Sequence, residues 1–428
     1  MPKDSYDFLI VGSGAGGATL ARELSRRGKR VLVLESGRRE TSVGTYRDSL
    51  RYYDRNRWTK RAARSKEGVI LWRTCMAGGS TVVASGNATR CLERALPALG
   101  ISLDEELSEA ERDTKPAPIP EQSLSEVSQA LMSAAKALGY HMQRIPKFID
   151  LAKCRRCGQC TNGCAYGAKW SALEYLDEAI ENGADVLCST RVRRVVVENG
   201  KARGVVASGP HGEIEYSSGT VILAAGALGT PLILQASGLG EAGSGLFGDL
   251  YLVTNGLIKG LHHTEEPASP LVDLEFHESK GFILRCPYVL PRSTKLISIG
   301  SRRMWLPTHR LVGIMTKIVD EASGRVYPDG SISKPVTERD WMRLREGSSI
   351  ARDILIEAGA NPRLIVTSRP MAANLGGTAA IGRVVDKNLQ TAVGGLFVCD
   401  GSVLPETPGM PPILTIIALA KRLAKNLV

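Results

Sequence analysis

The sequence predicts an α/β protein in which a Rossmann-like nucleotide-binding domain is joined to a second domain built on an antiparallel sheet. Three observations support this fold class. The chain opens with a strand, a glycine-rich turn, a helix and a second strand; residues 251–369 contain strand-like segments with partial alternation of polarity; and four cysteines lie close together in residues 154–164. The cysteines predict a small metal-binding segment between the two larger units.

Composition and charge narrow the function class. A chain of 428 residues has room for two or three domains. The net charge is +11, but the Lys and Arg residues are spread along the chain, which argues against nucleic-acid binding and suits an acidic protein partner or an anionic substrate. The longest apolar stretches, 221–236 and 411–420, are short or broken by Gly and Pro, so no membrane span is expected. Without a visible secretory signal, we expect a cytoplasmic protein.

The N-terminal segment predicts a dinucleotide site. After the apolar run "YDFLIV", Gly12, Gly14 and Gly17 have the G-x-G-x-x-G spacing, and the strand "RVLVLE" delivers Glu35. Gly12 would allow the turn, Gly14 would let the backbone approach a pyrophosphate, and Gly17 would let the helix pack on the strand. The helix N-terminus stabilises phosphates, and Glu35 would accept hydrogen bonds from a ribose.

Two later segments favour FAD over NAD. The segment 220–231 is a buried strand that ends in small residues, among them Ala225 and Gly226, so that the chain returns beside the nucleotide. Near the C-terminus a strand ends at Asp400 and Gly401, and a loop leads to a last helix that begins near Pro412. In flavoproteins an acid at such a position holds the ribityl chain, and the positive end of the helix faces the flavin pyrimidine.

The cysteine segment "CRRCGQCTNGCAYGAK" (154–169) predicts an iron–sulfur cluster. Cys154, Cys157, Cys160 and Cys164 have the C-x2-C-x2-C-x3-C spacing of ferredoxin segments that bind four-iron clusters. Zinc is the main rival and structural or redox thiols are the third possibility, but structural zinc sites tend to separate two C-x2-C pairs by a longer stretch. The fourth ligand stays open between Cys164 and a remote thiol, Cys75, Cys91 or Cys188. Lys169 is expected to be exposed; the alternative is that it lies beside the thiolates and offsets part of the charge of the cluster.

Taken together, these segments resemble the glucose–methanol–choline (GMC) oxidoreductases. The stretch 76–90, with Gly78, Gly79 and Ser80, looks like the first family signature; 226–240 fits the second; 323–360 looks like the hairpin and helix of the substrate domain; and 374–409 is similar to the segment that closes over the flavin. The resemblance implies an FAD-dependent enzyme, here a short member of the family with a ferredoxin-like cysteine motif added.

The chain departs from the family pattern at the proton-accepting pair. Members that oxidise alcohols usually carry a His where this chain has Asn374, and a His or Asn where it has Pro411. Asn374 is the matching candidate for the catalytic position, but its amide is no base near neutral pH. Pro411 and Pro412 are expected to begin the last helix. No His lies in residues 74–90, where some relatives attach the flavin covalently, so we expect dissociable FAD.

The combined prediction is an FAD-dependent dehydrogenase or reductase in which a 4Fe-4S cluster relays single electrons between the flavin and an external, ferredoxin-like carrier. The organic substrate would belong to the CH–OH, C=O or C=C class. Two alternatives remain: an alcohol oxidase that uses oxygen and has a structural metal, and a non-catalytic electron-transfer subunit.

The predicted domains are an FAD-binding domain from residues 1–95, 184–250 and 370–428, a helical connection of 96–183 that carries the cysteines, and a substrate domain of 251–369. Strands are expected in "LVDLEFH", "GFILRCPYVL", "KLISIGSRRMW" and "RLVGIMTKIV", and a helix over 124–139. Leu173, Leu176 and Ile180 are expected on one buried helix face. His262, His263, His277, His309, Glu265 and Glu266 are expected at the surface, and Cys399 is expected to be a small buried apolar residue.

Overall fold

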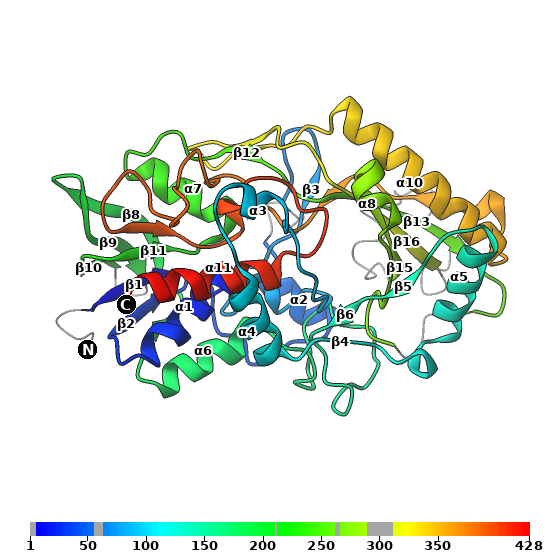
Figure 1. The fold of residues 1–428 in the computed structure, drawn as a ribbon, viewed down its shortest axis with the longest axis horizontal. Helices are drawn as coiled ribbons and strands as arrows, with labels where there is room; N and C mark the ends of the chain where they lie inside the picture. The colour runs from blue at the N-terminus through cyan, green and yellow to red at the C-terminus, as the bar shows by residue number, and fades with distance from the viewer. Residues whose placement is uncertain (1–5, 55–62, 210–211, 262–265, 289–310) are drawn as a thin grey trace.

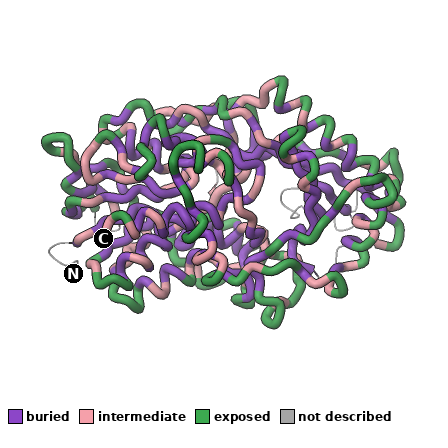
Figure 2. The backbone as a smooth tube through the Cα atoms, in the orientation of Figure 1, coloured by how far each residue is buried: buried purple, intermediate pink, exposed green. Residues whose placement is uncertain are grey.

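A computed structural model describes residues 6–54, 63–209, 212–261, 266–288 and 311–428 of the chain (Figure 1). Two large sheets organise it. The first is a five-stranded parallel sheet and the second an eight-stranded, mainly antiparallel sheet. Figure 1 places them at opposite ends of the long axis, and Figure 2 shows the buried backbone concentrated along both. The chain therefore has the α/β architecture with an antiparallel second unit that the sequence predicts.

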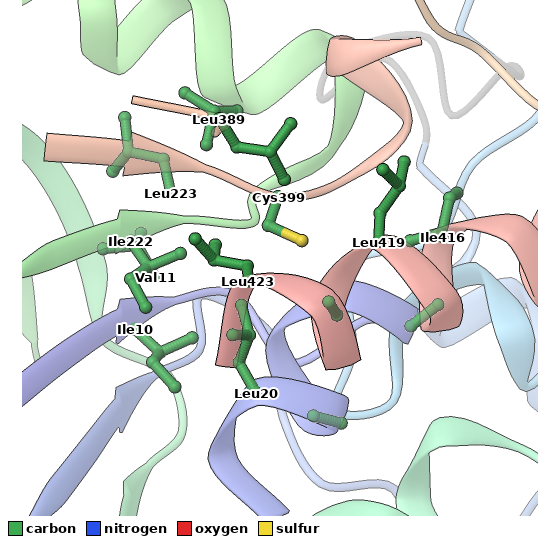
Figure 3. Close-up of a cluster of buried hydrophobic side chains, with 14 of the residues drawn as sticks. Ile10, Val11, Leu20, Ile222, Leu223, Leu389, Cys399, Ile416, Leu419 and Leu423 are labelled. Atoms are coloured by element: carbon green, nitrogen blue, oxygen red, sulfur yellow. The ribbon is translucent and has the colours of Figure 1, made fainter. Parts of the chain in front are cut away.

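The parallel sheet has the strand order β21-β11-β1-β2-β7. Its strands are short and apolar: β21 (Leu396–Val398), β11 (Val221–Leu223), β1 (Phe8–Val11), β2 (Val31–Leu34) and β7 (Asp185–Leu187). Helix α1 (Ala15–Ser25) contacts α6 (Ala172–Glu181) and α11 (Ile413–Asn426), and α11 contacts α4 (Asp104–Thr114). In Figure 3, side chains of α1 and α11 meet those of β1 and β11, with the sulfur of Cys399 among them. Cys399 is fully buried, as predicted.

A small antiparallel sheet and a helix flank this unit. The sheet has the order β10-β9-β8, with β8 (Arg191–Glu198), β9 (Lys201–Gly209) and β10 (Gly212–Ser217). Helix α7 (Gly226–Ala236) follows β11 directly and packs on β8. The turn that joins β11 to α7 therefore lies at the carboxyl end of the parallel sheet, where doubly wound folds bind ligands.

The second large sheet has the order β3-β20-β13-β16-β15-β14-β5, and β19 also pairs with β13. Its central strands are β13 (Leu250–Leu257), β16 (Leu311–Ile318) and β15 (Phe282–Tyr288), and its shorter strands are β14 (Leu271–Asp273), β5 (Gln143–Arg144), β3 (Ile70–Leu71), β19 (Val366–Thr367) and β20 (Met371–Ala372). Strands β3 and β20 come from segments predicted to serve the FAD domain, so those segments contribute to both units.

The two faces of this sheet have different partners. Leu250, Leu252 and Leu284 belong to one buried cluster with Leu344 and Ile354 of α10 (Glu338–Glu357), to which α5 (Glu126–Ala137) also contributes. Because neighbouring residues of a strand point to opposite faces, Tyr251, Val253 and Met315 form a separate cluster on the other face. That second face is turned toward the site described below.

Two local predictions were wrong. "LVDLEFH" is a strand only to Asp273, whose side-chain oxygen accepts a hydrogen bond from the Glu275 backbone N–H at 2.9 Å, and helix α8 (Glu275–Lys280) follows. Ile180 does not lie on the buried face of α6, since 43% of it is exposed. "GFILRCPYVL" and "RLVGIMTKIV" give β15 and β16, and the helix expected over 124–139 is α5. "KLISIGSRRMW", His262, His263, His309 and Glu265 lie outside the described residues.

No helix among the described residues has both the length and the apolar character needed to cross a lipid bilayer.

Gly347 fixes how closely α10 approaches the sheet, and this contact yields a stability prediction. A Cβ at this position would lie 2.3 Å from Thr316 Cγ2 and 3.1 Å from Phe282 Cδ2. We expect Gly347→Ala to lower the free energy of unfolding by about 1–3 kcal/mol, although alanine favours a helix by about 1 kcal/mol. Urea denaturation measures this loss of stability. Gly240→Ala is the control, because a Cβ at position 240 would have no atom within 4 Å. Equal or greater stability of Gly347→Ala would contradict the packing described.

Candidate functional site

A cavity of about 710 Å³ lies between the carboxyl end of the parallel sheet and the second face of the eight-stranded sheet. Its volume is in the range of ligand-binding pockets. It is lined by ten of the predicted cofactor-binding residues, namely Gly12, Gly14, Glu35, Gly79, Ser80, Ala225, Gly226, Asp400, Gly401 and Pro412. Gly17 and Gly78, the remaining two, lie directly behind this lining, as described below.

The glycine-rich turn leaves room for a phosphate group. Gly12 has a φ of +99°, which favours glycine, and a Cβ at Gly17 would lie 2.0 Å from the Gly12 carbonyl oxygen. Gly17 therefore permits the close packing of α1 on the turn after β1. A Cβ at Gly14 would meet nothing within 4 Å, since Gly14 faces the cavity. Gly14, the N-cap residue of α1, offers no side-chain cap, and the first turn carries no acidic residue, so an anion at this helix start would meet neither a competing cap nor a like charge.

Glu35 is held in place at the end of β2. One of its carboxylate oxygens accepts hydrogen bonds from the Ser13 backbone N–H at 3.0 Å and from the Ser13 hydroxyl at 2.7 Å, and the other accepts one from the Gly37 N–H at 2.7 Å. The Ser13 hydroxyl oxygen in turn accepts a hydrogen bond from the Gly78 N–H at 3.1 Å. These contacts tie the glycine-rich turn to the Gly78–Gly79 turn while Glu35 still lines the cavity.

Asp400 connects the other two cavity-lining segments. One carboxylate oxygen accepts hydrogen bonds from the Gly226 N–H at 2.8 Å and the Thr230 hydroxyl at 2.6 Å, and the other accepts one from the Ser402 N–H at 2.7 Å. Pro412 is the N-cap residue of α11, and Pro411, Pro412 and Ile413 line the cavity. The start of a buried helix is therefore directed at the ligand space, with the partial positive charge that helix N-termini carry.

The end of the cavity that lies against the eight-stranded sheet, called the sheet end below, contains charged residues that we did not predict from the sequence. Lys317 and Arg285 both line the cavity and are buried. The Lys317 ammonium lies 2.5 Å from a carboxylate oxygen of Asp249. Asn374, the predicted catalytic position, lines the cavity too, and its amide nitrogen donates a hydrogen bond to the same Asp249 oxygen at 2.9 Å.

Burial dominates the acid–base properties of this pair. It raises the pKa of Asp249 and lowers the pKa of Lys317, and the attraction between the two groups opposes both shifts. The Gly409 N–H donates to the second Asp249 oxygen at 2.9 Å. Asn374 therefore helps to hold Asp249, and Asp249 holds the Lys317 ammonium at the cavity. Arg285 and Lys317 are each the one charged residue in an apolar segment, 282–288 and 311–318. Because charged residues are rarely buried without a function or a partner, this pattern could have marked both as candidates.

A second, smaller cavity is lined by all four cysteines of the motif, Cys154, Cys157, Cys160 and Cys164. The alternative thiols Cys75, Cys91 and Cys188 are not among its lining residues. Burial is the main cause that raises the pKa of the Cys154 thiol, and the three other cysteines raise it further. Among the residues that the structure describes, no group of three or more His, Cys, Asp or Glu residues is arranged to hold a metal ion.

The two cavities share a wall. Thr161 and Asn162 line the large cavity, whereas the residues on either side of them in the chain, Cys160 and Gly163, line the small one. Hydroxyl groups fix this segment, because Tyr53 donates to the Thr161 carbonyl oxygen at 2.6 Å and Tyr52 to that of Asn162 at 2.5 Å. The cysteine motif is thus part of the lining of the predicted flavin site.

Two of our surface predictions were wrong near this wall. Lys169 is buried, lines the cysteine cavity, and donates hydrogen bonds to the carbonyl oxygens of Thr81 at 3.1 Å and Val82 at 2.8 Å. Glu266 is also buried, because it accepts hydrogen bonds from the hydroxyl groups of Ser125 and Ser128 at 2.7 Å. His277 is partly buried beside the Pro408 carbonyl oxygen, at 2.8 Å, and does not line either cavity.

Relatives cover almost the whole chain. It is 30% identical to an uncharacterized GMC-type oxidoreductase of Mycobacterium tuberculosis, over 99% of this chain and 76% of that protein. It is 28% identical to an uncharacterized protein of Methanocaldococcus jannaschii, over 99% of this chain and 100% of that one.

Solved structures share the fold. Pyridoxine 4-oxidase from Mesorbium loti has a TM-score of 0.76 at 19% identity, covering 99% of each chain. A formate oxidase from Aspergillus oryzae, whose FAD modification was studied by mutation, has a TM-score of 0.75 at 17% identity over 100% of this chain and 99% of that one.

The GMC oxidoreductase family models match residues 6–254 with the N-terminal part and residues 319–420 with the C-terminal part. Together with the cavity geometry, these matches establish FAD as the cofactor class of the fold and identify an oxidoreductase. The chain belongs to the GMC oxidoreductase family.

Proposed function

We propose that this GMC oxidoreductase passes hydride between an organic substrate of the CH–OH, C=O or C=C class and FAD, and that a 4Fe-4S cluster on the cysteine motif relays single electrons to or from an external carrier. The observation that carries the proposal is the shared wall, in which Thr161 and Asn162 line one cavity and their chain neighbours line the other. A flavin exchanges electrons in pairs and an iron–sulfur cluster one at a time, so their proximity would allow conversion between the two.

The lining residues fit FAD. Gly14 and the start of α1 would receive the pyrophosphate, Glu35 the adenosine ribose, and Asp400 the ribityl chain. Gly79 approaches Gly14 so closely that a Cβ on it would lie 3.0 Å from the Gly14 Cα, so a side chain at position 79 would crowd the turn that would receive the pyrophosphate. Pro412, at the start of α11, would face the flavin pyrimidine.

Although the described residues hold no ready-made metal site, the four cysteines line one small cavity, and this supports a cluster on the segment. The segment turns back on itself at four residues with positive φ values between 53° and 91°, namely Arg156, Gly158, Gly163 and Gly167. These turns bring the four cysteines to the same cavity. The cavity lining supports Cys164 as the fourth ligand. Lys169, buried in the same lining, would offset part of the negative charge that thiolates bring to the cluster.

The outer side of the cysteine segment fits an acidic carrier. Cys157 is exposed, and so are Lys153, Arg155 and Arg156 around it. Positive charge at this point would steer an acidic, ferredoxin-like protein toward the cluster. The cluster would then lie between the carrier and the flavin.

Lys317 supports a route for the substrate proton in a chain that lacks the usual His pair. Its ammonium lies at the cavity, and burial lowers its pKa, which makes proton release easier than from an exposed lysine. Asp249 would act as a positioning residue because it holds the lysine, and Asn374 would act through Asp249, to which it donates a hydrogen bond. The Lys317 ammonium would supply a proton to a substrate that is reduced, and the neutral amine would accept one from a substrate that is oxidised.

A second candidate is an oxygen-using oxidase with a structural metal. Two solved structures that share this fold over nearly the whole chain are oxidases, which is the reason to test this candidate. Peroxide formation separates the two candidates, as described below.

The iron and sulfide content of the protein gives the first prediction of the proposed function. Protein purified without oxygen should contain about four irons and four sulfides per chain, as one four-iron cluster requires, together with FAD. Cys160→Ser should lose most of the iron and keep FAD, whereas the control Cys188→Ser should keep both, because Cys188 does not line the cysteine cavity. Zinc in place of iron, or the same metal content in both variants, would refute the cluster.

Electron counting is the second prediction. Anaerobic titration with dithionite should consume about three electrons per chain, two for the flavin and one for the cluster, and about two in Cys160→Ser. When fully reduced protein is mixed with air, the oxidase candidate predicts rapid peroxide formation, in an amount matching the FAD, with and without the cysteine. Rapid peroxide formation by both proteins would overturn the relay in favour of the oxidase.

The buried Asp249–Lys317 pair yields the third prediction. Lys317→Met leaves a buried carboxylate without its cation and should lower the free energy of unfolding by about 3–5 kcal/mol. The double variant Asp249→Asn, Lys317→Met should recover part of this loss, because neither charge remains. Urea denaturation of the wild type, Lys317→Met, the single variant Asp249→Asn and the double variant gives the coupling energy, expected to exceed about 1 kcal/mol. Additive effects of the two substitutions would show that these residues do not form the pair.

A further inference from the structure

We propose that the substrate carries a carboxylate group and that Arg285 binds it at the sheet end of the large cavity. This inference deepens the proposed function and rests on it only in placing FAD and the substrate in the same cavity. It does not depend on the cysteine motif.

Strand register places Arg285 on the face that lines the cavity. Met315 on β16 pairs with Arg285 on β15, and Lys317 pairs with Tyr251 on β13. Side chains two residues apart along a strand share a face, so Arg285 and Lys317 are diagonal neighbours on one surface. All four residues line the cavity. The charge of Arg285 also lowers the pKa of Lys317, after the larger effect of burial, which is consistent with this proximity.

Arg285 is a buried cation with few hydrogen-bond partners in the described structure. Only 5% of it is exposed. One terminal nitrogen donates a hydrogen bond to the Ser85 hydroxyl at 3.1 Å, while its Nε has no hydrogen-bond partner. Ser85 also lines the cavity.

Neither buried acid near Arg285 forms an ion pair with it. Asp249 pairs with Lys317 at 2.5 Å, and Glu266 accepts hydrogen bonds from Ser125 and Ser128. Within the described part of the chain, no carboxylate lies in ion-pair contact with Arg285. Of the buried charged groups at this end of the cavity, Arg285 and Lys317 are positive and Asp249 is negative, which leaves one positive charge uncompensated.

A ligand anion would correct this imbalance. Burial lowers the pKa of Arg285 to about 10, so the guanidinium still carries its charge at neutral pH. An uncompensated buried charge is costly, and the planar guanidinium matches a carboxylate with two parallel hydrogen bonds. A carboxylate carries the single negative charge that is missing, whereas a phosphate monoester would bring nearly two.

The rest of the cavity indicates an apolar body for the same substrate. Tyr53 and Trp72 meet edge to face with ring centroids 5.5 Å apart, and Tyr251 and Tyr288 do so at 6.3 Å. All four rings line the cavity. Benzoate combines a carboxylate with an aromatic body and is therefore a suitable probe, with benzamide as its neutral counterpart.

The test is binding of benzoate, benzamide and phenyl phosphate to the oxidised, FAD-containing protein. Perturbation of the flavin absorption spectrum reports the dissociation constants, and the melting temperature reports binding independently. We expect benzoate to bind at least about tenfold more tightly than benzamide or phenyl phosphate, and Arg285→Met to weaken benzoate binding by about 10–100-fold while benzamide is unaffected. Arg285→Lys should recover part of the affinity.

The control is Arg352→Met, because Arg352 is exposed on α10, away from the cavity lining. Equal affinity for benzoate and benzamide, or equal benzoate affinity of wild type and Arg285→Met, would overturn the proposal. Tighter binding of phenyl phosphate would overturn the choice of a carboxylate. FAD and iron are assayed on the same samples, so a missing cluster would count against the relay and leave this inference standing.

Discussion

The wall between the two cavities is the constraint on which the proposed function depends. Cys160, Thr161, Asn162 and Gly163 are consecutive, yet the outer two line the cysteine cavity and the inner two line the large cavity in which we propose FAD to bind. Two tyrosine hydroxyls donate hydrogen bonds to the carbonyl oxygens of Thr161 and Asn162. The Lys169 ammonium donates hydrogen bonds to the carbonyl oxygens of Thr81 and Val82. Any movement of the cysteine segment would therefore change the shape of the flavin site. This physical continuity is the reason for treating the cysteines as part of the catalytic unit.

Electrostatics links the same regions. Lys147 and Lys169 are buried, and burial lowers the pKa of Lys147 to about 7 and that of Lys169 to about 8, while Cys160 acts in the opposite direction on both. The charge of Arg285, which lines the large cavity, also lowers the pKa of Lys147. The interior thus carries an excess of basic groups from the thiols to the substrate region. Such an interior suits anionic occupants at both ends: thiolate-bound iron at one and a carboxylate at the other.

Local sequence patterns were enough to find most of the residues that line one side of the large cavity and the cysteine cavity, but they missed charged residues at the other side. Gly12, Gly14 and Gly17 act within one strand–turn–helix unit, and the cysteines lie within one short loop, so spacing along the chain was enough to place them. Asp249, Lys317 and Asn374 come from three distant segments that only strand pairing brings together, and no local rule links them. Lys169 and Glu266 were misjudged for the same reason, since the groups that satisfy them lie far away in the sequence. Gly281, which has a positive φ, ends the short helix α8, whose first three residues we predicted as the end of a strand.

The central claim is that a multi-iron group occupies the cysteine cavity directly behind the flavin wall. A crystal structure of the oxygen-free protein, with diffraction recorded on both sides of the iron absorption edge, tests it most directly. The account predicts anomalous density for several irons enclosed by Cys154, Cys157, Cys160 and Cys164, separated from the FAD by Thr161 and Asn162. Iron elsewhere in the molecule, a single zinc in this cavity, or FAD bound away from residues 161–162 would contradict it.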